Sequence, residues 1–385
     1  MKRVAILGST GMIGRNTLAV IAAHPEAFCV SALAAGSNLP LLAEQIRAFR
    51  PDLVSLGRKE DAVALRRRLG RRGPRVVFGP EGAAEVGGGG ESDIVVSAIT
   101  GISGLRPTLA AIRAGRRLAL ANKESMVVAG ALLRREARAA GAEIVPVDSE
   151  HSGVFQCLAR EKKRNIGKVI LTASGGPFLK TSLREIAGKT VAQALNHPRW
   201  KMGRKVTIDS ATMMNKGLEL IEARWLFDLS PEALGILVHP QSIVHALVEM
   251  RDGSVIAQLS PTDMKIPIQY ALTWPERFAP VVPPLDLAEI GRLEFNRPDE
   301  RRFPLLRTAG WALREGESAP VALNAANEVA VEAFLGGRIG FGGIRAVVDE
   351  TVAGHRTTRV ASLEDVLEAD REARARAHSI LKQRC

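Results

Sequence analysis

The chain has 385 residues, of which 46% are hydrophobic and 24% are charged. These proportions are typical of a globular protein and exclude a disordered or fibrous chain, while the length predicts two or three domains. No apolar run reaches the roughly 20 residues of a membrane-spanning helix, so no membrane association is expected. The net charge of +12 at pH 7 suits anionic ligands. Because basic residues do not alternate with aromatic ones, no nucleic-acid partner is expected.

The cysteines predict neither a disulfide framework nor a zinc site. Cys29, Cys157 and Cys385 are far apart and lack the spacing of metal ligands. Cys157 lies on the apolar side of a helical pattern and is expected in the core rather than as a nucleophile. A reducing, cytoplasmic location fits this usage. The basic runs Arg66–Arg68 and Arg71–Arg72 are expected to be solvated surface at the end of a helix.

Strand and helix patterns alternate through residues 1–147. Such alternation predicts βαβ units and therefore a Rossmann-like, doubly wound, mostly parallel sheet. Ligands of these sheets bind at the carboxyl ends of the strands. The glycines of 87–90 are expected to form a flexible loop. The predicted strands lie near 3–7, 29–34, 52–56, 75–78, 93–99, 117–121 and 143–147.

Residues 148–275 predict a central α+β catalytic domain. A helix is expected near 212–228, and strands at 243–250 and 254–260 flank a turn at 251–254, as in a hairpin. Residues 276–290 form a proline-rich linker, which is expected to be stiff and extended. Residues 291–385 form a helical bundle, with helices predicted at 303–314, 320–335, 343–354 and 363–382.

A glycine-rich turn follows the first predicted strand. Gly8, Gly11 and Gly14 have the spacing GxxGxxG and open a helix. Glycines there allow a tight turn and the close approach of a pyrophosphate, which the N–H groups of the helix start attract. The strand and helix around the motif favour a dinucleotide site over an ordinary turn.

The loop after the second strand bears on which dinucleotide binds. NAD-binding folds usually place an acid there to bind the ribose 2′-hydroxyl. This chain instead has Gly36, Ser37 and Asn38 after Ala34-Ala35, which favours NADP(H). The alternative is an ordinary loop between a strand and a helix, whose sequence does not indicate which cofactor binds.

Acidic residues in two segments suggest a metal site. Asp148 and Glu150 follow a strand, and residues two apart in an extended segment share a face. Their hard oxygen ligands suit Mg²⁺ or Mn²⁺, although a helix N-cap with surface acids explains them equally well. Glu219 could complete a three-carboxylate site, since a helix starting near Thr212 places Asn215, Lys216 and Glu219 on one face. Judged alone, that stretch favours a surface pair of Lys216 with Glu219.

Other segments suit an anionic substrate. Residues 172–177, with Ser174 and two glycines, could form a phosphate nest. Residues 196–203, with His197 and Trp200, have the composition of a mobile lid, although an ordinary basic loop is the alternative. Lys123 follows the sixth strand, where this fold places reactive groups, and residues 239–241 are expected to support the site.

Together these segments resemble the 1-deoxy-D-xylulose 5-phosphate reductoisomerase family, the NADPH enzymes of the non-mevalonate isoprenoid pathway. The resemblance covers nearly the whole chain. Its marks are GSTGMIG (8–14), LANKES (120–125), VDSEHS (147–152), TASGGPF (172–178), HPRWKMGRKVTIDSATMMNKGLELIEA (197–223) and HPQSIVH (239–245).

The resemblance implies a homodimeric reductoisomerase that rearranges a phosphorylated sugar and reduces it with NADPH, using Mg²⁺, Mn²⁺ or else Co²⁺. It implies Asp148, Glu150 and Glu219 as metal ligands, with Lys123 and Lys216 also catalytic and Trp200 as the lid residue. The implied substrate-binding residues are Lys123, Ser149, Ser174, His197, Trp200, Ser210, Asn215 and Lys216. The implied cofactor-binding residues are Thr10, Gly11, Met12, Ile13, Gly36, Ser37, Asn38, Asn122, Glu124 and Gly203.

Two positions depart from the usual pattern of the family. Met12 replaces a usual serine, and Ser37 stands where many relatives have a basic residue. Ser37 leaves the preference for NADPH over NADH open. Two other functions remain open alternatives: a semialdehyde or homoserine-type dehydrogenase, and a non-enzymatic NADPH-dependent redox sensor.

Overall fold

The structure is a computed structural model that describes residues 1–70 and 73–384. Arg71, Arg72 and Cys385 lie outside the described residues, and so do the expectations that concern them. The chain forms two compact units. Unit one contains Met1–Ser125, Leu133–Ser152 and Asp263–Pro284, and unit two contains Met126–Leu132, Gly153–Thr262 and Leu285–Cys385. The four domain ranges expected from the sequence stay a prediction.

Unit one contains a seven-stranded parallel sheet, which confirms the seven predicted strands. Its order is β4-β3-β2-β1-β5-β6-β7, and every neighbouring pair is parallel. The strands are β1 (Lys2–Leu7), β2 (Phe28–Ala35), β3 (Leu53–Leu56), β4 (Arg75–Phe78), β5 (Ile94–Ser97), β6 (Arg117–Leu120) and β7 (Ile144–Pro146).

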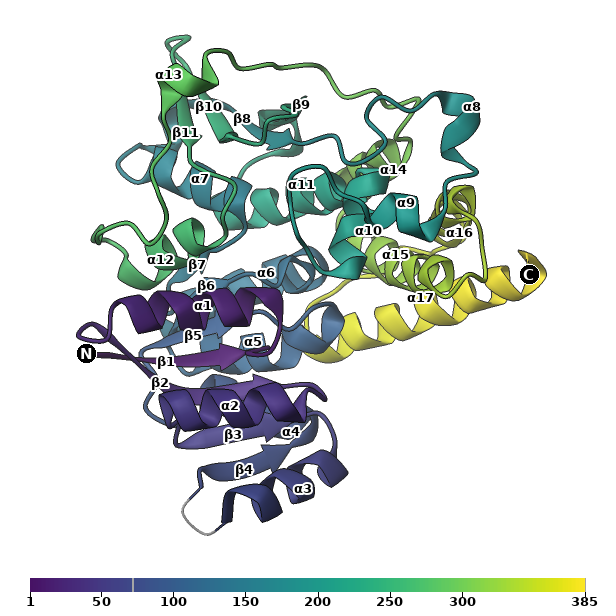
Figure 1. Ribbon diagram of the computed structural model, residues 1–385. Coiled ribbons are helices and arrows are strands. Elements are labelled where there is room, and N and C mark those ends of the chain that lie inside the picture. Colours follow the sequence, from purple (N-terminus) through teal and green to yellow (C-terminus); the bar gives the residue numbers. More distant parts are fainter. Residues whose placement is uncertain (71–72, 385) are drawn as a thin grey trace. The chain divides into compact units, whose positions relative to one another are not determined.

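Helices connect these strands and cover the sheet (Figure 1). Right-handed crossovers place α1 to α3 on one face and α4 and α5 on the other. The strand order reverses between β1 and β5, and such a switch point is where doubly wound sheets bind ligands. The helices are α1 (Met12–Ala23), α2 (Leu39–Phe49), α3 (Lys59–Leu69), α4 (Gly79–Gly88), α5 (Leu105–Arg113) and α12 (Lys265–Thr273), while α6 (Lys123–Ala140) and α7 (Ser149–Leu158) are divided between the units.

The expectation of a flexible loop at 87–90 is wrong for its first half. Gly87 and Gly88 belong to α4, and Gly87 is buried. A Cβ at Gly87 would lie 2.4 Å from the carbonyl oxygen of Pro107. Glycine is therefore needed there for the close packing of α4 on α5 rather than for flexibility.

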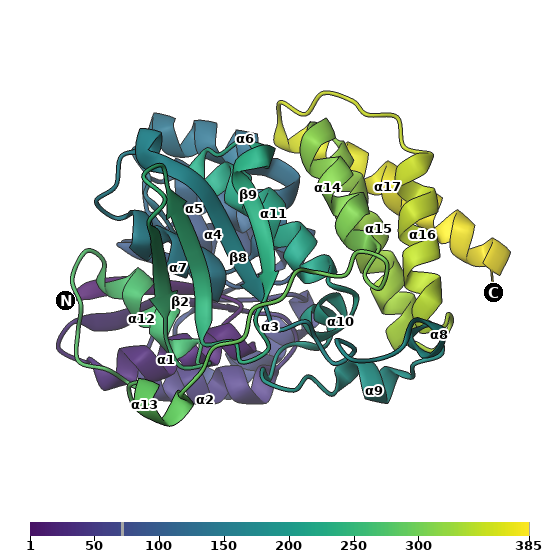
Figure 2. The same ribbon diagram turned by 90° about the horizontal axis from the view of Figure 1, so that it is seen from above.

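Unit two contains a four-stranded sheet, in the order β11-β10-β8-β9. The predicted hairpin is confirmed, since β10 pairs with β11 in antiparallel register and Gly253 turns the chain with φ of 87°. Figure 2 shows this sheet from above, together with the helices of unit two. The strands are β8 (Ile166–Ala173), β9 (Leu234–Val238), β10 (Val244–Met250) and β11 (Val255–Leu259).

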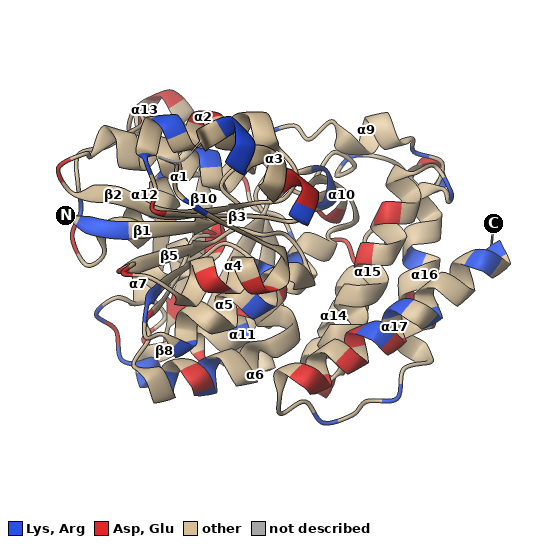
Figure 3. Cartoon of the chain, turned by 90° about the horizontal axis from the view of Figure 1, so that it is seen from below, with Lys and Arg blue, Asp and Glu red and all other residues tan. Residues whose placement is uncertain are grey.

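The predicted C-terminal bundle is confirmed by four helices, with α15 in its middle. This helix is apolar on nearly every side and is almost completely buried, as expected for a helix surrounded by others. The outer helix α17 is rich in charged residues and carries acids and bases along its length (Figure 3). The helices are α14 (Leu305–Glu315), α15 (Ala319–Leu335), α16 (Phe341–Ala353) and α17 (Leu363–Arg384).

The predicted helix at 212–228 corresponds to α11, but the chain forms a second helix directly before it. Met213, with φ of 61°, separates α10 from α11. The linker also contains a short helix, α13, which was not expected. The remaining helices of unit two are α8 (Leu183–Ile186), α9 (Val191–Leu195), α10 (Arg204–Thr212), α11 (Met214–Phe227) and α13 (Leu287–Ile290). Among the described residues, no helix combines the length and apolar character that crossing a membrane requires.

Candidate active site

The glycine-rich turn lies at the carboxyl end of β1, next to the switch point. Gly8 has φ of 90°, and a Cβ there would lie 2.5 Å from the carbonyl oxygen of Ala98, after β5. Gly11 precedes α1, whose N-terminus has no side-chain cap and no acid in its first turn. The N–H groups of Met12, Ile13 and Gly14 therefore have no partner within the helix, which suits them to an anion.

The loop after β2 lies beside the same edge of the sheet. Gly36, Ser37 and Asn38 are exposed. Asn38 also caps α2, because its Oδ1 accepts a hydrogen bond of 3.3 Å from the N–H of Leu41. Its Nδ2 takes no part in this capping bond, so it could donate a hydrogen bond to a ligand.

Asn122 holds two loops of the sheet together. Its Nδ2 donates to the carbonyl oxygens of Ile99, at 2.6 Å, and Gly101, at 3.1 Å. Its Oδ1 caps α6 at the N–H of Ser125. The side chain is 2% exposed and already engaged, so a cofactor contact at this position would use the main chain. Glu124 is also buried, and its carboxylate accepts from Asn122 at 3.1 Å.

Four predicted site residues meet in unit one, where β6 and β7 end. The Nζ of Lys123 lies 2.5 Å from Oδ2 of Asp148. The main-chain N–H of Ser149 donates to Oδ1 of Asp148 at 3.0 Å, and its hydroxyl donates to Glu150 at 2.6 Å. The segment is not extended as predicted, because α7 begins at Ser149. Ser149 nonetheless links the two carboxylates.

In unit two, the first turns of α11 bring together Asn215, Lys216 and Glu219, as the helical spacing predicted. The Nδ2 of Asn215 lies 2.5 Å from Oε1 of Glu219, and Lys216 forms an ion pair with the other oxygen. The prediction of a surface pair is wrong, since Lys216 is 3% exposed and Glu219 is fully buried. A buried carboxylate must be balanced by a cation, and Lys216 supplies one here.

Ser174, His197 and Ser210 form a second cluster in unit two. Ser174 follows β8, His197 lies in the loop after α9, and Ser210 belongs to α10. The Nε2 of His197 is 3.0 Å from the hydroxyl of Ser174 and 3.1 Å from that of Ser210. Gly176 donates its N–H to the Ser174 hydroxyl at 3.2 Å. Three of the side chains that the resemblance implies as substrate-binding therefore converge.

The hydrogen bonds of His197 define its tautomer. Nδ1 accepts from the main-chain N–H groups of Arg199, at 3.2 Å, and Trp200, at 2.9 Å, so it carries no hydrogen. The neutral ring then has its hydrogen on Nε2, which donates toward the two serines. Burial lowers the pKa of His197 to about 4, and the ring stays neutral near pH 7. The serine hydroxyls keep their own hydrogens for an anion.

The expected lid, 196–203, contains neither helix nor strand. Trp200 is half-buried, and its ring centroid lies 6.2 Å from that of His245. Gly203 is exposed and directly precedes α10. Whether the segment closes over a substrate stays a prediction, as does the cofactor contact of Gly203.

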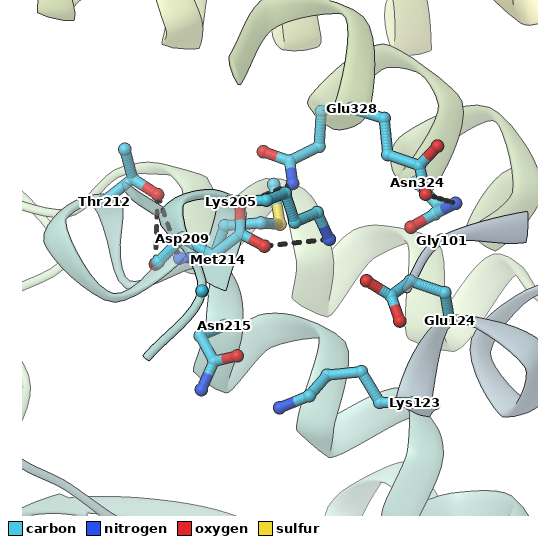
Figure 4. A network of polar contacts seen from close by, with 12 residues as sticks. Gly101, Lys123, Glu124, Lys205, Asp209, Thr212, Met214, Asn215, Asn324 and Glu328 are labelled. Atoms are coloured by element: carbon cyan, nitrogen blue, oxygen red, sulfur yellow. Dashed lines mark hydrogen bonds and ion pairs between the residues drawn. The ribbon is translucent and has the colours of Figure 1, made fainter. Parts of the chain in front are cut away.

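Asp209 is a support residue to which the sequence alone assigned no role (Figure 4). Its carboxylate is 1% exposed. It accepts from Nζ of Lys205 at 2.9 Å and from Nδ2 of Asn327, on α15, at 2.7 Å. These bonds fix α10, which carries Ser210. The available signal was an acid four residues after a lysine on one helical face, but Asn327 is 118 residues away.

His239 is also a support residue, as expected. It is fully buried, and its ring stacks on Phe295 with centroids 4.8 Å apart. Its N–H donates to the carbonyl oxygen of Ala173 at 2.7 Å, which fixes the end of β8 directly before Ser174.

The predicted metal ligands belong to different units: Asp148 and Glu150 to unit one, and Glu219 to unit two. Each half of the expected site is formed within its own unit. Their convergence on one ion stays a prediction.

Comparison with known proteins places these clusters in a family context. Family models for 1-deoxy-D-xylulose 5-phosphate reductoisomerase match residues 4–130, and those for its C-terminal domains match residues 144–227 and 259–376. The enzyme of this name from Prosthecochloris aestuarii is 52% identical over 380 residues, covering 99% of this chain and 100% of the relative. The chain belongs to this family. The resemblance seen in the sequence is thereby confirmed. The namesake from Geobacter metallireducens is also 52% identical, over 99% of each chain.

Solved structures of the family confirm the α/β fold class. A DOX-P reductoisomerase in complex with NADPH, fosmidomycin and magnesium superposes with a TM-score of 0.93 at 41% identity, covering 99% of this chain and 98% of the other. The enzyme from Zymomonas mobilis in complex with NADPH gives a TM-score of 0.92 at 41% identity, over 99% of each chain.

Proposed function

We propose that this protein converts 1-deoxy-D-xylulose 5-phosphate to 2-C-methyl-D-erythritol 4-phosphate, by a rearrangement of the carbon skeleton followed by reduction with NADPH. The full-length identity of 52% to a reductoisomerase of that name carries this proposal. The cluster of Ser174, His197 and Ser210 supports it independently, because it is suited to an anionic group.

NADPH fits unit one. The uncapped start of α1 offers N–H groups from Met12 and Ile13 to the pyrophosphate. A side chain at Gly8 would collide with the loop after β5, so the turn has the close approach of main chains that this fold needs. Thr10 and the loop 36–38 lie beside it at the same edge, where the nucleotide would be held.

A divalent cation fits the donors of both units. We infer that Asp148, Glu150 and Glu219 bind one Mg²⁺ or Mn²⁺, because all three offer the hard oxygen ligands that these ions prefer. Lys123 and Lys216 now neutralise two of the acids. A bound cation would neutralise these carboxylates in place of the lysines, so the ammonium groups of Lys123 and Lys216 could interact with the substrate.

The chain's own residues would then position the sugar phosphate. Ser174 and Ser210 would donate their hydroxyl hydrogens to the phosphate, while His197 holds both serine oxygens in place. Asn215 and Lys216 would extend this set along α11. The bound groups would supply a Lewis acid at the substrate's carbonyl and hydroxyl oxygens, from the metal, and a hydride, from NADPH. Binding the remote phosphate would contribute the free energy that orients the reacting carbons.

We also propose that the enzyme is a cytoplasmic homodimer that pairs through β11. This strand lies at the edge of the sheet, and Val255 and Ile256 are 54% and 37% exposed. An exposed apolar edge strand is a template for pairing with another chain. Val255→Lys should give monomers in light scattering, whereas Val63→Lys, at an exposed valine on α3, should not.

The activity is tested by NADPH consumption with 1-deoxy-D-xylulose 5-phosphate, with and without EDTA. We expect turnover that EDTA abolishes and added Mg²⁺ or Mn²⁺ restores. Glu219→Gln should lower kcat by at least about 100-fold, while Glu161→Gln, at an exposed acid, should have no effect. Absence of turnover with every metal would refute the proposal.

A further inference from the structure

The loop expected to receive the adenosine ribose has no cation. Gly36, Ser37 and Asn38 are neutral and exposed. The 2′-phosphate that distinguishes NADPH from NADH is strongly negative, and proteins usually bind it with a guanidinium or ammonium group. A chain that selects NADPH therefore needs a positive charge from another segment near this loop.

The next strand of the sheet brings a cation to this place. β2 and β3 are parallel, with Ala35 opposite Leu56. The pairing continues beyond both strands, because the N–H of Gly57 donates to the carbonyl oxygen of Gly36 at 3.0 Å. The following residues are Ser37 in one segment and Arg58 in the other. Neighbouring segments in such a register lie about 5 Å apart, well within the reach of an arginine side chain.

The conformation of Arg58 suits this role. Its backbone is extended, with φ of −120° and ψ of 147°, and its side chain is 71% exposed. Nε lies 3.3 Å from Oδ2 of Asp61. A guanidinium has five N–H donors, so this contact orients the group and leaves the Nη donors for a ligand.

We propose that Arg58 recognises the 2′-phosphate of NADPH and so determines the preference for NADPH over NADH. This inference rests on the proposed function, because it concerns the cofactor of the same reaction. Arg58 would supply the positive charge for the 2′-phosphate that a basic residue at position 37 would otherwise supply. Glu60 and Asp61 balance the positive charges of Arg58 and Lys59, so this segment has no net charge that would attract an anion over a long distance. Recognition therefore comes from direct hydrogen bonds of the guanidinium.

Equilibrium binding tests the role of Arg58 without turnover. Dissociation constants for NADPH, NADH, 2′,5′-ADP and 5′-AMP are measured by calorimetry with the full chain. Arg58→Ala should weaken NADPH and 2′,5′-ADP by about ten-fold, the loss expected for a charge-assisted hydrogen bond. NADH and 5′-AMP should bind as before. Arg58→Glu should weaken the phosphorylated pair further, and Arg58→Lys should restore part of the loss.

Arg67→Ala is the matched control, because Arg67 is an exposed arginine at the other end of α3. It removes the same charge more than two turns away and should change none of the four constants. Equal weakening of NADPH and NADH by Arg58→Ala would overturn the proposal, as would no change in either. Loss of NADPH binding in Lys59→Ala alone would also overturn it. If the unaltered chain bound neither dinucleotide, the proposed function itself would fail.

Discussion

Gly176→Ala is expected to damage the cluster of Ser174, His197 and Ser210 through two effects that the structure separates. Gly176 has φ of 67°, and a Cβ there would lie 2.5 Å from the carbonyl oxygen of Ser210. The left-handed backbone costs an alanine about 1 kcal/mol. Relieving the collision costs about 1–3 kcal/mol more, as in overpacked cores. The free energy of unfolding should therefore fall by about 2–4 kcal/mol in total.

A second glycine isolates the backbone effect. Gly253 has φ of 87°, and no atom lies within 4 Å of its Cβ position. Gly253→Ala should therefore lose only about 1 kcal/mol. Because Gly176 also donates to Ser174, only Gly176→Ala should move that hydroxyl away from the substrate.

The two variants are compared by urea denaturation and by steady-state kinetics with the sugar phosphate. Gly176→Ala should raise KM about ten-fold or more, as expected for lost hydrogen bonds to a charged group, and Gly253→Ala should leave it unchanged. Equal losses of stability in both variants, with an unaltered KM, would show that α10 moves freely away from the loop. The reasoning would then be wrong.

Three further predictions concern side chains of unit two. In NMR titrations of the imidazole, His197 should stay neutral down to about pH 4. Because its pKa in the folded chain lies below the 6.5 of an unfolded chain, the free energy of unfolding should fall as the pH is lowered from about 6.5 to about 4. A His197 resonance that titrates near pH 6.5 would contradict a partly buried ring whose Nδ1 accepts two main-chain hydrogen bonds. Cys157→Ser should keep full activity, and the native thiol should resist alkylation at pH 7, because burial raises its pKa to about 11. Rapid alkylation would contradict the raised pKa of this half-buried thiol. Asp209→Ala should lower stability by about 3 kcal/mol, because Lys205 and Asn327 lose a buried partner, and a change below about 1 kcal/mol in urea denaturation would show that the pair is dispensable.

The sequence predicted the sheet of unit one strand by strand, because its strands are short apolar runs bounded by clear turns. It also predicted the hairpin and the four helices of the bundle. In contrast, it did not predict the boundary between α10 and α11. Met213 takes a left-handed conformation there, and methionine carries no local signal for that conformation. Such a backbone is imposed by tertiary packing.

The candidate site was predicted in composition rather than in geometry. Ser174, His197 and Ser210 were expected to act together, and the structure brings them together. The tautomer of His197 could not be predicted, because it depends on the main-chain N–H groups of the loop that follows. The same holds for Asp148 and Glu150. They were expected in an extended segment after a strand, whereas the serine between them starts a helix and links their carboxylates.

The bond between Asn327 and Asp209 has a consequence for attempts to shorten the chain. The last helices might be regarded as a dispensable appendage, since none of them supplies a predicted ligand. Yet Asn327 on α15 donates to Asp209, the acid that anchors α10 one residue before Ser210. Removing the C-terminal region would take the Asn327 hydrogen bond away from the buried Asp209 carboxylate and leave Lys205 to hold it. A minimal catalytic fragment of this protein therefore has to retain α15.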